Sequence, residues 1–253
     1  MEIIFLGTGT SQGVPVIGCK CPVCISNEKK DKRLRTSLFV KTDKINILID
    51  AGPDFRQQML RENITKLDAI LFTHEHKDHI SGLDDIRAFN FMTKKPMEIY
   101  AEIRVQKALQ KEYSYVFSDN PYPGIPKLNF NTIAEDIFYI DDIKITPIRL
   151  MHQHLPILGF RIGDLSYITD ANYIAKKEKE KLSGSKVFII NALRREKHIS
   201  HFTLNEAVEI AKEVGAEKTY LTHISHNMGL HKSIKSELPK NIEPAYDGFK
   251  LKI

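Results

Sequence analysis

The sequence Thr73-His74-Glu75-His76-Lys77-Asp78-His79 follows directly on the apolar stretch Leu67-Asp68-Ala69-Ile70-Leu71-Phe72. The apolar stretch is typical of a buried strand, and three imidazoles and an aspartate follow it within a few residues. Packing does not favour so many polar groups at a strand end, whereas a pair of divalent cations would bind them. The stretch therefore predicts a dinuclear metal site of the kind that metal-dependent hydrolases use.

The spacing within this run divides the ligands between two cations. Residues two apart in an extended segment face the same side, so His74 and His76 can bind one metal together. Asp78 and His79 come as the chain turns into a helix, and they suit a second metal, although Asp78 could instead only cap that helix. Imidazole and carboxylate ligands suit zinc, manganese, iron or nickel.

Later segments repeat the pattern of a strand that runs into a polar residue. Thr169-Asp170 and Thr222-His223 each follow an apolar run, as Thr73-His74 does. In open α/β sheets, sites form beyond the carboxyl ends of strands. A lone Asp170, His223 or His152 is more often structural than a ligand, but two metals need more ligands than residues 74–79 supply. We therefore expect these residues to complete the site.

Length and charge limit the class of protein. The chain has 253 residues, which is enough for one large domain, and we find no linker that would divide it, so we expect a single domain over 1–253. A net charge of +5 suits an anionic substrate but does not require nucleic acid. With no membrane-length apolar run and no signal peptide, we expect a cytoplasmic protein that does not bind membranes.

Strand-like and helical segments alternate in mixed order, which predicts an α/β sandwich with sheets inside and helices outside. Ile80, Leu83, Ile86 and Phe89 recur every third residue and predict a helix after the ligand run. Further helices are expected over 102–112, 173–182 and 203–214, the last with a Thr203–Glu206 capping box. Strands are expected at Ile3–Leu6, Ser37–Lys41, Ile45–Ile49, Ala69–Phe72, Glu98–Tyr100, Ile137–Ile140, Ile143–Leu150, Gly159–Ile162, Leu165–Ile168, Val187–Ile190 and Thr219–Leu221.

The three cysteines, Cys19, Cys21 and Cys24, form a C-x-C-x-x-C motif that predicts a second metal site. An odd number of cysteines in a reducing compartment argues against a disulfide framework. Three thiolates leave one position of a tetrahedral zinc site open, and His226, three residues after His223, is the expected fourth ligand. The alternatives are three free buried thiols or a redox motif. We expect a structural zinc that contributes folding energy rather than chemistry.

The motif H-x-H-x-D-H after a strand resembles the metallo-β-lactamase superfamily, and the resemblance extends over nearly the whole chain. It implies a four-layer αββα sandwich of two mixed β-sheets flanked by helices. It also implies that one metal is held by His74, His76 and His152, the other by Asp78, His79 and His223, with Asp170 between them. Asp50 would orient ligands from below the site, or would only form a strand-end turn with Gly52. Of His152 and His154, we prefer His152 as the ligand.

The segment Gly7–Pro15 together with C-x-C-x-x-C resembles the cyclic-phosphate phosphodiesterases of the carbon–phosphorus lyase pathway. It is also similar to the pyrroloquinoline-quinone biosynthesis B branch. The first resemblance implies hydrolysis of a small or cyclic phosphodiester by a hydroxide that bridges the two metals. Asp78 would position that hydroxide, and His201, a non-ligand histidine in related branches, would be the general acid. The alternative for His201 is a structural place beside Thr203, and His198 is a weaker candidate for phosphate contact.

Other functions compete with this prediction. A tRNA 3′-end processing endonuclease is not favoured, since no long basic arm is present to bind RNA. A quinone-biosynthesis oxidoreductase, which redox-active iron would favour, and a non-catalytic metal-binding protein remain as alternatives. The irregular stretch Tyr113–Leu128 either covers the site and stacks on a substrate or packs its own aromatic residues. The family often forms homodimers, but nothing in the sequence marks an interface.

Overall fold

The computed structural model of the chain describes residues 1–118 and 122–253, and the strands of this part form two sheets. The first sheet has the order β15-β1-β2-β3-β4-β5-β6. Its strands pair antiparallel from β15 to β3 and parallel from β3 to β6. Their bounds are Glu2–Gly7 (β1), Ser37–Lys41 (β2), Asn46–Ile49 (β3), Ala69–Leu71 (β4), Met97–Ala101 (β5), Leu128–Thr132 (β6) and Lys250–Lys252 (β15).

The second sheet has the order β11-β8-β9-β10-β12-β13-β14, with β7 paired to β8 beside this path. It is also mixed, because β11 to β10 pair antiparallel whereas β10, β12, β13 and β14 pair parallel. The bounds are Phe138–Ile140 (β7), Ile143–His152 (β8), Leu155–Ile162 (β9), Leu165–Tyr167 (β10), Tyr173–Ile174 (β11), Val187–Asn191 (β12), Lys218–Thr222 (β13) and Ile242–Pro244 (β14).

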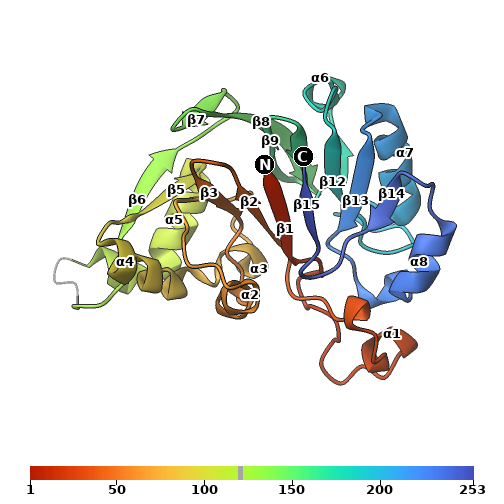
Figure 1. Ribbon diagram of the computed structural model, residues 1–253, viewed down its shortest axis with the longest axis horizontal. Coiled ribbons are helices and arrows are strands. Elements are labelled where there is room, and N and C mark those ends of the chain that lie inside the picture. The colour runs from red at the N-terminus through yellow and green to blue at the C-terminus, as the bar shows by residue number, and fades with distance from the viewer. Residues whose placement is uncertain (119–121) are drawn as a thin grey trace.

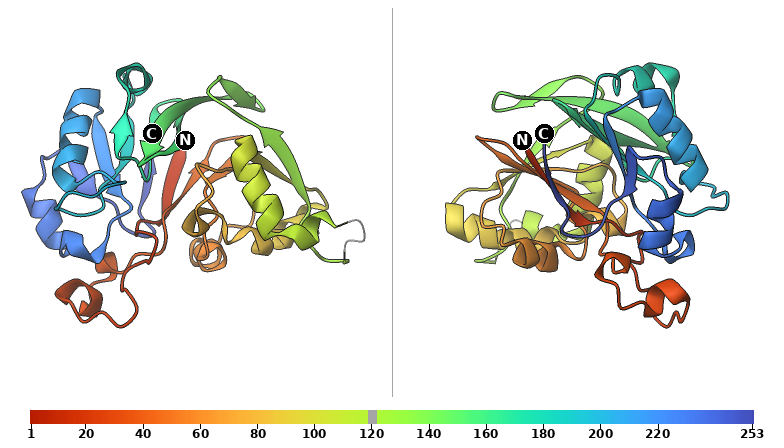
Figure 2. Two further views of the ribbon diagram at one scale, coloured as in Figure 1. Left: turned by 180° about the vertical axis from the view of Figure 1, so that it is seen from behind. Right: turned by 45° about the vertical axis from the view of Figure 1, so that its right-hand side comes forward.

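Helices cover the outer faces of both sheets (Figure 1 and Figure 2). Helices α2 to α5 lie on the first sheet, and α7 and α8 lie on the second. The helix bounds are Pro22–Ile25 (α1), Phe55–Glu62 (α2), Lys77–Ile80 (α3), Arg87–Thr93 (α4), Ile103–Glu112 (α5), Lys176–Glu180 (α6), Leu204–Val214 (α7) and His231–Glu237 (α8), with 3-10 turns at Lys29–Asp31 (η1), Leu83–Ile86 (η2), Ser114–Phe117 (η3) and His226–Met228 (η4).

The alternation of side chains along each strand builds this layering. Successive residues of a strand face opposite sides of the sheet. Ile3 and Phe5 of β1 therefore belong to the core between the sheets, whereas Ile4 and Leu6 pack beneath the helices of the first sheet. Strands that are buried on both faces need continuous apolar runs, as β1 has. The predicted four-layer sandwich of two mixed sheets is confirmed.

Two of the predicted helices differ from the structure. The segment after the ligand run is divided into α3, the turn η2 and α4. A spacing of three residues matches the 3-10 helix rather than the α-helix, which explains the break at η2. The segment 173–182 contains the short strand β11 before α6. The capping box at the start of α7 is confirmed, since Thr203 and Glu206 bond each other's backbone N–H groups.

The irregular stretch Tyr113–Leu128 is only partly described. It starts with the turn η3 and ends where β6 begins, and residues 119–121 lie outside the described residues. Within the part that is described, no helix has the length and the apolar character needed to cross a membrane.

Candidate metal centre

The predicted ligands lie together at one edge of the two sheets, on segments that end strands. His74 and His76 follow β4, Asp78 and His79 lie in α3, His152 ends β8, Asp170 follows β10 and His223 follows β13. The ring centroid of His74 lies 4.2 Å from that of His79 and 4.7 Å from that of His76. The ring of His152 lies 4.9 Å from the ring of His76. The structure thus brings together residues that are up to 149 positions apart in the sequence (74 to 223).

One carboxylate oxygen of Asp170 lies between the imidazoles of His79 and His223, which follow strands of the two different sheets. Oδ2 of Asp170 lies 3.2 Å from Nε2 of His79 and 3.1 Å from Nδ1 of His223. Nε2 of His79 also lies 3.1 Å from Oδ2 of Asp78. The ligand atoms of these four residues all lie within 4.8 Å of one another, as they would around a cation.

Unpartnered nitrogen atoms show that these residues fit a metal. Nε2 of His74, Nε2 of His79 and Nδ1 of His223 are buried and form no hydrogen bond of acceptable geometry in the described part of the chain, although the last two lie 3.1–3.2 Å from carboxylate oxygens. Buried polar atoms nearly always have a partner, and an orphaned atom calls for an explanation such as a missing ion. Three such atoms beside carboxylates have the donor chemistry that a divalent transition metal uses.

Electrostatics favour the protonation states that bind metals. Burial lowers the pKa of His74 well below its ordinary value and lowers the pKa of His223 to about 4. Burial opposes ionisation of Asp78 and Asp170, but neighbouring imidazoles outweigh it and hold the pKa of both carboxyls low. Neutral imidazoles and ionised carboxylates are the forms in which these side chains ligate a cation.

The pKa of His79 shows that the surroundings of this ring favour a positive charge. Burial alone would lower its pKa, yet the surrounding carboxylates of Asp78, Asp170 and Asp50 raise that pKa well above the ordinary value. Three carboxylates around one imidazole favour a positive charge at this point, and a bound cation supplies the same charge.

Asp50 lies beneath the centre and holds it in place. Its Oδ1 accepts a hydrogen bond from the backbone N–H of Thr73 at 2.9 Å. Its Oδ2 accepts from the hydroxyl of Thr73 at 2.8 Å and faces Nδ1 of His79 at 2.7 Å. A carboxylate that binds the far nitrogen of a ligating histidine fixes the orientation and the tautomer of that ring. Asp50 therefore lies where it can orient His79, and it directly follows β3.

The backbone is strained at the same place. Asp50, Asp170 and His223 have φ values of 64°, 58° and 54°. Non-glycine residues rarely adopt this left-handed region, and each instance costs about 1–3 kcal/mol. Gly52 lies next to this strain, and a Cβ atom on it would come within 2.0 Å of the carbonyl oxygen of Asp78. Glycine at this position therefore lets α3 approach the end of β3.

The two candidate histidines at the end of β8 and in the turn after it occupy different environments. His152 is buried, and its Nδ1 lies 2.9 Å from the carbonyl oxygen of Ser200, which leaves Nε2 available to a ligand. Burial lowers the pKa of His152, consistent with a neutral ring. His154 is exposed and belongs to no cluster of candidate ligand residues in the described part of the chain. The geometry favours His152, as predicted.

His201 lies at the same centre without belonging to the predicted ligand set. Its Nε2 lies 3.1 Å from Oδ1 of Asp170, and its ring centroid lies 4.7 Å from that of His152. On the other side of the ring, Nδ1 lies 3.0 Å from the hydroxyl of Ser200 and 3.2 Å from Nδ1 of His198. A second imidazole and a hydroxyl behind His201 can pass a proton to it or receive one.

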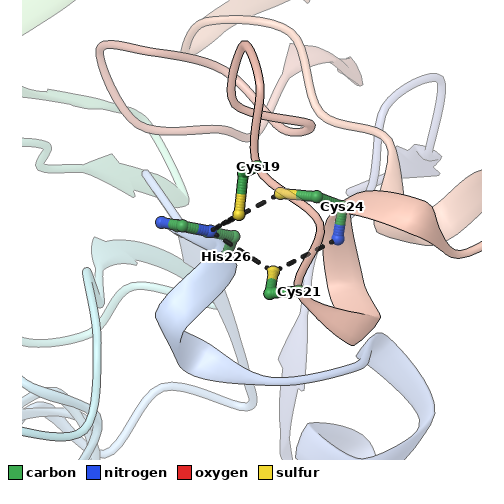
Figure 3. A group of neighbouring side chains, drawn as sticks. All are labelled: Cys19, Cys21, Cys24 and His226. Atoms are coloured by element: carbon green, nitrogen blue, oxygen red, sulfur yellow. Dashed lines mark hydrogen bonds between the residues drawn. The ribbon is translucent and has the colours of Figure 1, made fainter.

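The cysteine motif meets His226 at a separate cluster (Figure 3). The Sγ atoms of Cys19, Cys21 and Cys24 lie 3.3, 3.4 and 3.5 Å from Nδ1 of His226. A backbone hydrogen bond from Cys24 lowers the pKa of the Cys21 thiol to about 6, whereas burial raises the pKa of the Cys24 thiol to about 11. Three thiols and one imidazole with mutually close donor atoms fit a tetrahedral zinc.

Backbone bonds connect the two clusters. His226 begins η4, three residues after His223. Between them, the N–H of Ile224 donates to the carbonyl of Thr8, and the N–H of Thr10 donates to the carbonyl of Ile224. The glycine-containing segment 7–13 therefore holds the loop that carries His223.

Several contacts that support the centre carry no signal in the sequence. Arg104 donates to the carboxylate of Glu75 and to the carbonyl of Pro156, and so ties the loop between His74 and His76 to α5 and β9. Glu75 inside the H-x-H motif gave no signal for this partner, because Arg104 is distant in sequence. The threonine before each strand-end ligand was visible as a repeat, but its hydrogen bonds were not.

Comparison with known proteins agrees with the fold and the site. A sequence model of the beta-lactamase superfamily domain matches residues 45–224, a span that contains every histidine and aspartate of the metal centre. The chain therefore belongs to the metallo-β-lactamase superfamily. A solved structure described as a new diphosphatase from the PhnP family is 38% identical, with a TM-score of 0.93 over 100% of this chain and 97% of that one. Within the superfamily, the chain thus falls in the PhnP family.

Two other similar proteins support fewer conclusions about this chain. Zn²⁺-bound PqqB from Methylobacterium extorquens has a TM-score of 0.80 over the full length of both chains but only 17% identity, and it shows the fold alone. An octanoyltransferase of Porphyromonas gingivalis is 44% identical over 98% of this chain and 51% of its own length. The present chain thus spans about half the length of that curated relative.

Proposed function

We propose that the chain is a dinuclear metal-dependent phosphodiesterase that hydrolyses a small or cyclic phosphodiester. The observation that carries the proposal is the set of unpartnered buried nitrogen atoms that face Asp78 and Asp170. The family and the fold support the coarser class, a metal-dependent hydrolase of the metallo-β-lactamase fold. The phosphodiester substrate is the finer part of the proposal.

The chain would hold two catalytic cations, of zinc, manganese, iron or nickel, with side chains that already lie together. His74, His76 and His152 would bind one cation, Asp78, His79 and His223 the other, and Asp170 both. Two such cations supply Lewis acidity and neutralise the charge on phosphoryl oxygens. The separate cluster of cysteines with His226 would hold a structural zinc.

His201 would supply the proton that a leaving alkoxide needs. Its Nε2 points to the carboxylate of Asp170, so the N–H that donates there faces the place of reaction. Its Nδ1 is held by the hydroxyl of Ser200. A general acid must lie within hydrogen-bond reach of the atom it protonates, and His201 would meet this condition for a substrate held at the metal centre beside Asp170. Asp78, whose Oδ2 lies 3.1 Å from the same Nε2 of His79 that Asp170 faces, would orient the attacking water as an acceptor.

Charge and family together favour a phosphate-containing substrate. The net charge of +5 attracts anions, and the PhnP-family relative is described as a diphosphatase. A diphosphate-linked nucleotide is therefore the second candidate substrate, since the same centre would cleave either phosphoryl bond. We do not propose octanoyltransferase activity for this chain, because the relative with that name is about twice as long. All three cysteines of this chain lie with His226, which leaves no other thiol for an acyl intermediate.

Hydrolysis of bis-p-nitrophenyl phosphate tests the proposal. We expect turnover that disappears after chelation and returns with Mn²⁺ or Zn²⁺, and a His76→Ala variant that stays inactive after metal is restored. A panel of ribose cyclic phosphates, cyclic nucleotides and diphosphate-linked nucleotides would then separate the two substrate classes. Absence of turnover on every phosphate ester by fully metallated protein would contradict the proposal and favour a binding function.

A further inference from the structure

A threonine precedes the ligand at each of three strand ends, in Thr73-His74, Thr169-Asp170 and Thr222-His223. Thr73, Thr169 and Thr222 are all buried, with at most 1% of each residue exposed. Their hydroxyls nevertheless differ in what they bind. Those of Thr73 and Thr169 contact the next residue, whereas the hydroxyl of Thr222 has no partner in the described part of the chain.

The hydroxyl of Thr73 selects one tautomer of His74. A hydroxyl has one proton, and Oγ1 of Thr73 donates it to Oδ2 of Asp50 at 2.8 Å. The same oxygen lies 2.9 Å from Nδ1 of His74 and can only accept there. Nδ1 therefore carries the proton, and the lone pair of the neutral ring is on Nε2, the atom that is buried without a partner. Asp50 thus acts on His79 directly and on His74 through Thr73.

The hydroxyl of Thr169 selects one rotation of the Asp170 carboxylate. Oγ1 of Thr169 donates to Oδ2 of Asp170 at 2.6 Å. This is the oxygen that lies between Nε2 of His79 and Nδ1 of His223. The other oxygen, Oδ1, faces Nε2 of His201. With both oxygens engaged, the carboxylate cannot rotate without losing a hydrogen bond.

We propose that Thr73 and Thr169 are positioning residues of the metal centre, whose hydroxyls hold His74 and Asp170 in ligating orientation before a cation binds. Thr222 occupies the equivalent place before His223 without this role. The inference rests on the proposed function only in that the centre binds divalent cations. Loss of a partner that orients a ligand typically lowers metal affinity about 10–100-fold. We expect the loss of each hydroxyl to lower the affinity of the centre by a factor in this range.

Metal affinity, rather than activity, tests this inference. Thr73→Val and Thr169→Val remove each hydroxyl at nearly constant volume, and Thr222→Val is the matched control. Protein whose cysteine site keeps its zinc, and from whose other sites a chelator has removed metal, would be titrated calorimetrically with Mn²⁺, which prefers oxygen and nitrogen over thiolate ligands and so reports on this centre. We expect affinity to fall about 10–100-fold in the first two variants and to stay unchanged in Thr222→Val. Thr73→Ser and Thr169→Ser, which keep the hydroxyl, should restore most of the affinity.

The outcomes separate this inference from the proposed function. If Thr73→Val and Thr169→Val bind Mn²⁺ as tightly as Thr222→Val, the inference is wrong while the metal centre stands. If the wild-type chain takes up no Mn²⁺ at all, the proposed function fails first. Thr73→Ala and Thr169→Ala repeat the measurement should a valine variant not fold. A fall in melting temperature without a fall in affinity would indicate a merely structural hydroxyl and would also overturn the inference.

Discussion

Oδ2 of Asp50 lies 2.7 Å from Nδ1 of His79, and both side chains are completely buried. The side-chain carboxylate of Asp50 accepts hydrogen bonds from the backbone and hydroxyl of Thr73 and from the imidazole of His79. Burial raises the pKa of the Asp50 carboxyl, and the hydrogen bonds with His79 and Thr73 oppose that rise. The carboxylate is therefore matched to three donors, and a neutral amide of the same shape cannot accept from all of them.

Asp50→Asn should weaken metal binding about 10–100-fold, because one amide N–H₂ would face a donor in place of an acceptor. Metal content after dialysis, measured by atomic emission, checks the prediction. Asp54→Asn is a suitable control, since the hydrogen bonds of that carboxylate go to Arg35. Full metal retention by Asp50→Asn would reduce Asp50 to a strand-end turn with Gly52.

The buried His152 at the end of β8 and the exposed His154 after it give a second prediction. His152→Ala should lower the metal content of the centre, whereas His154→Ala should leave it unchanged, because His154 lies outside the cluster. Both variants remove an imidazole from the same short segment, so each controls for the other. Loss of metal in His154→Ala alone would reverse the assignment.

His201→Ala should keep nearly all of its metal and lose turnover. Removal of a general acid typically lowers kcat about 10²–10⁴-fold. Parallel measurement of metal content and of kcat on bis-p-nitrophenyl phosphate separates this role from ligation. Because His201 also lies within reach of Asp170 and His152, a variant that loses metal and activity together would make it a ligand instead.

Cys21→Ser should remove the structural zinc and destabilise the fold. We expect zinc to fall to about two-thirds, or less, of a three-metal total, since one tetrahedral site of three would be lost. The melting temperature should fall as well, because zinc affinity contributes to folding. Lys20→Ala, on the residue between two of the thiols, is the control. Unchanged zinc content in Cys21→Ser would show that the cluster does not need this thiolate.

Much of the fold could be predicted because its strands are buried on both faces. Short apolar runs rich in β-branched residues, such as residues 187–190, favour a strand over a helix by their length and composition. Strand β15 was not predicted, because Lys250–Lys252 contains a single apolar residue. This strand forms only by pairing with β1. At this strand, tertiary pairing and not local pattern determines the backbone.

The sequence suggests which residues ligate the metals, but it does not show which hydrogen bonds hold those ligands in place. The run from His74 to His79 shows the ligands because they lie close in sequence. The hydroxyl of Thr73 and the carboxylate of Asp50 meet only after β3 and β4 pair side by side. Polar contacts between distant segments carry no periodicity, so the sequence could suggest Asp50 only through resemblance and could not assign Thr73 a role.

A buried histidine away from the metal centre gives a pH-dependent prediction. His231 is 5% exposed, and its Nδ1 lies 3.3 Å from Nη2 of Arg33. Burial, with Arg33 and Lys30 adding positive charge, lowers the pKa of His231 from 6.5 to about 4. Between these values the unfolded chain binds a proton that the folded chain does not, so stability increases with pH there and is lost as pH falls from 6.5 to about 4.

His231→Gln should flatten this dependence, because an amide can accept from Arg33 but does not titrate. The free energy of unfolding by urea, measured at pH 7, 6, 5 and 4 in wild type and variant, checks it. The wild type should lose up to about 1.4 kcal/mol more per pH unit than the variant within the window. Above pH 7 the two pH profiles should run parallel, since His231 is neutral in both states of the protein. Parallel profiles at every pH would mean that His231 titrates in the folded chain as it does in water.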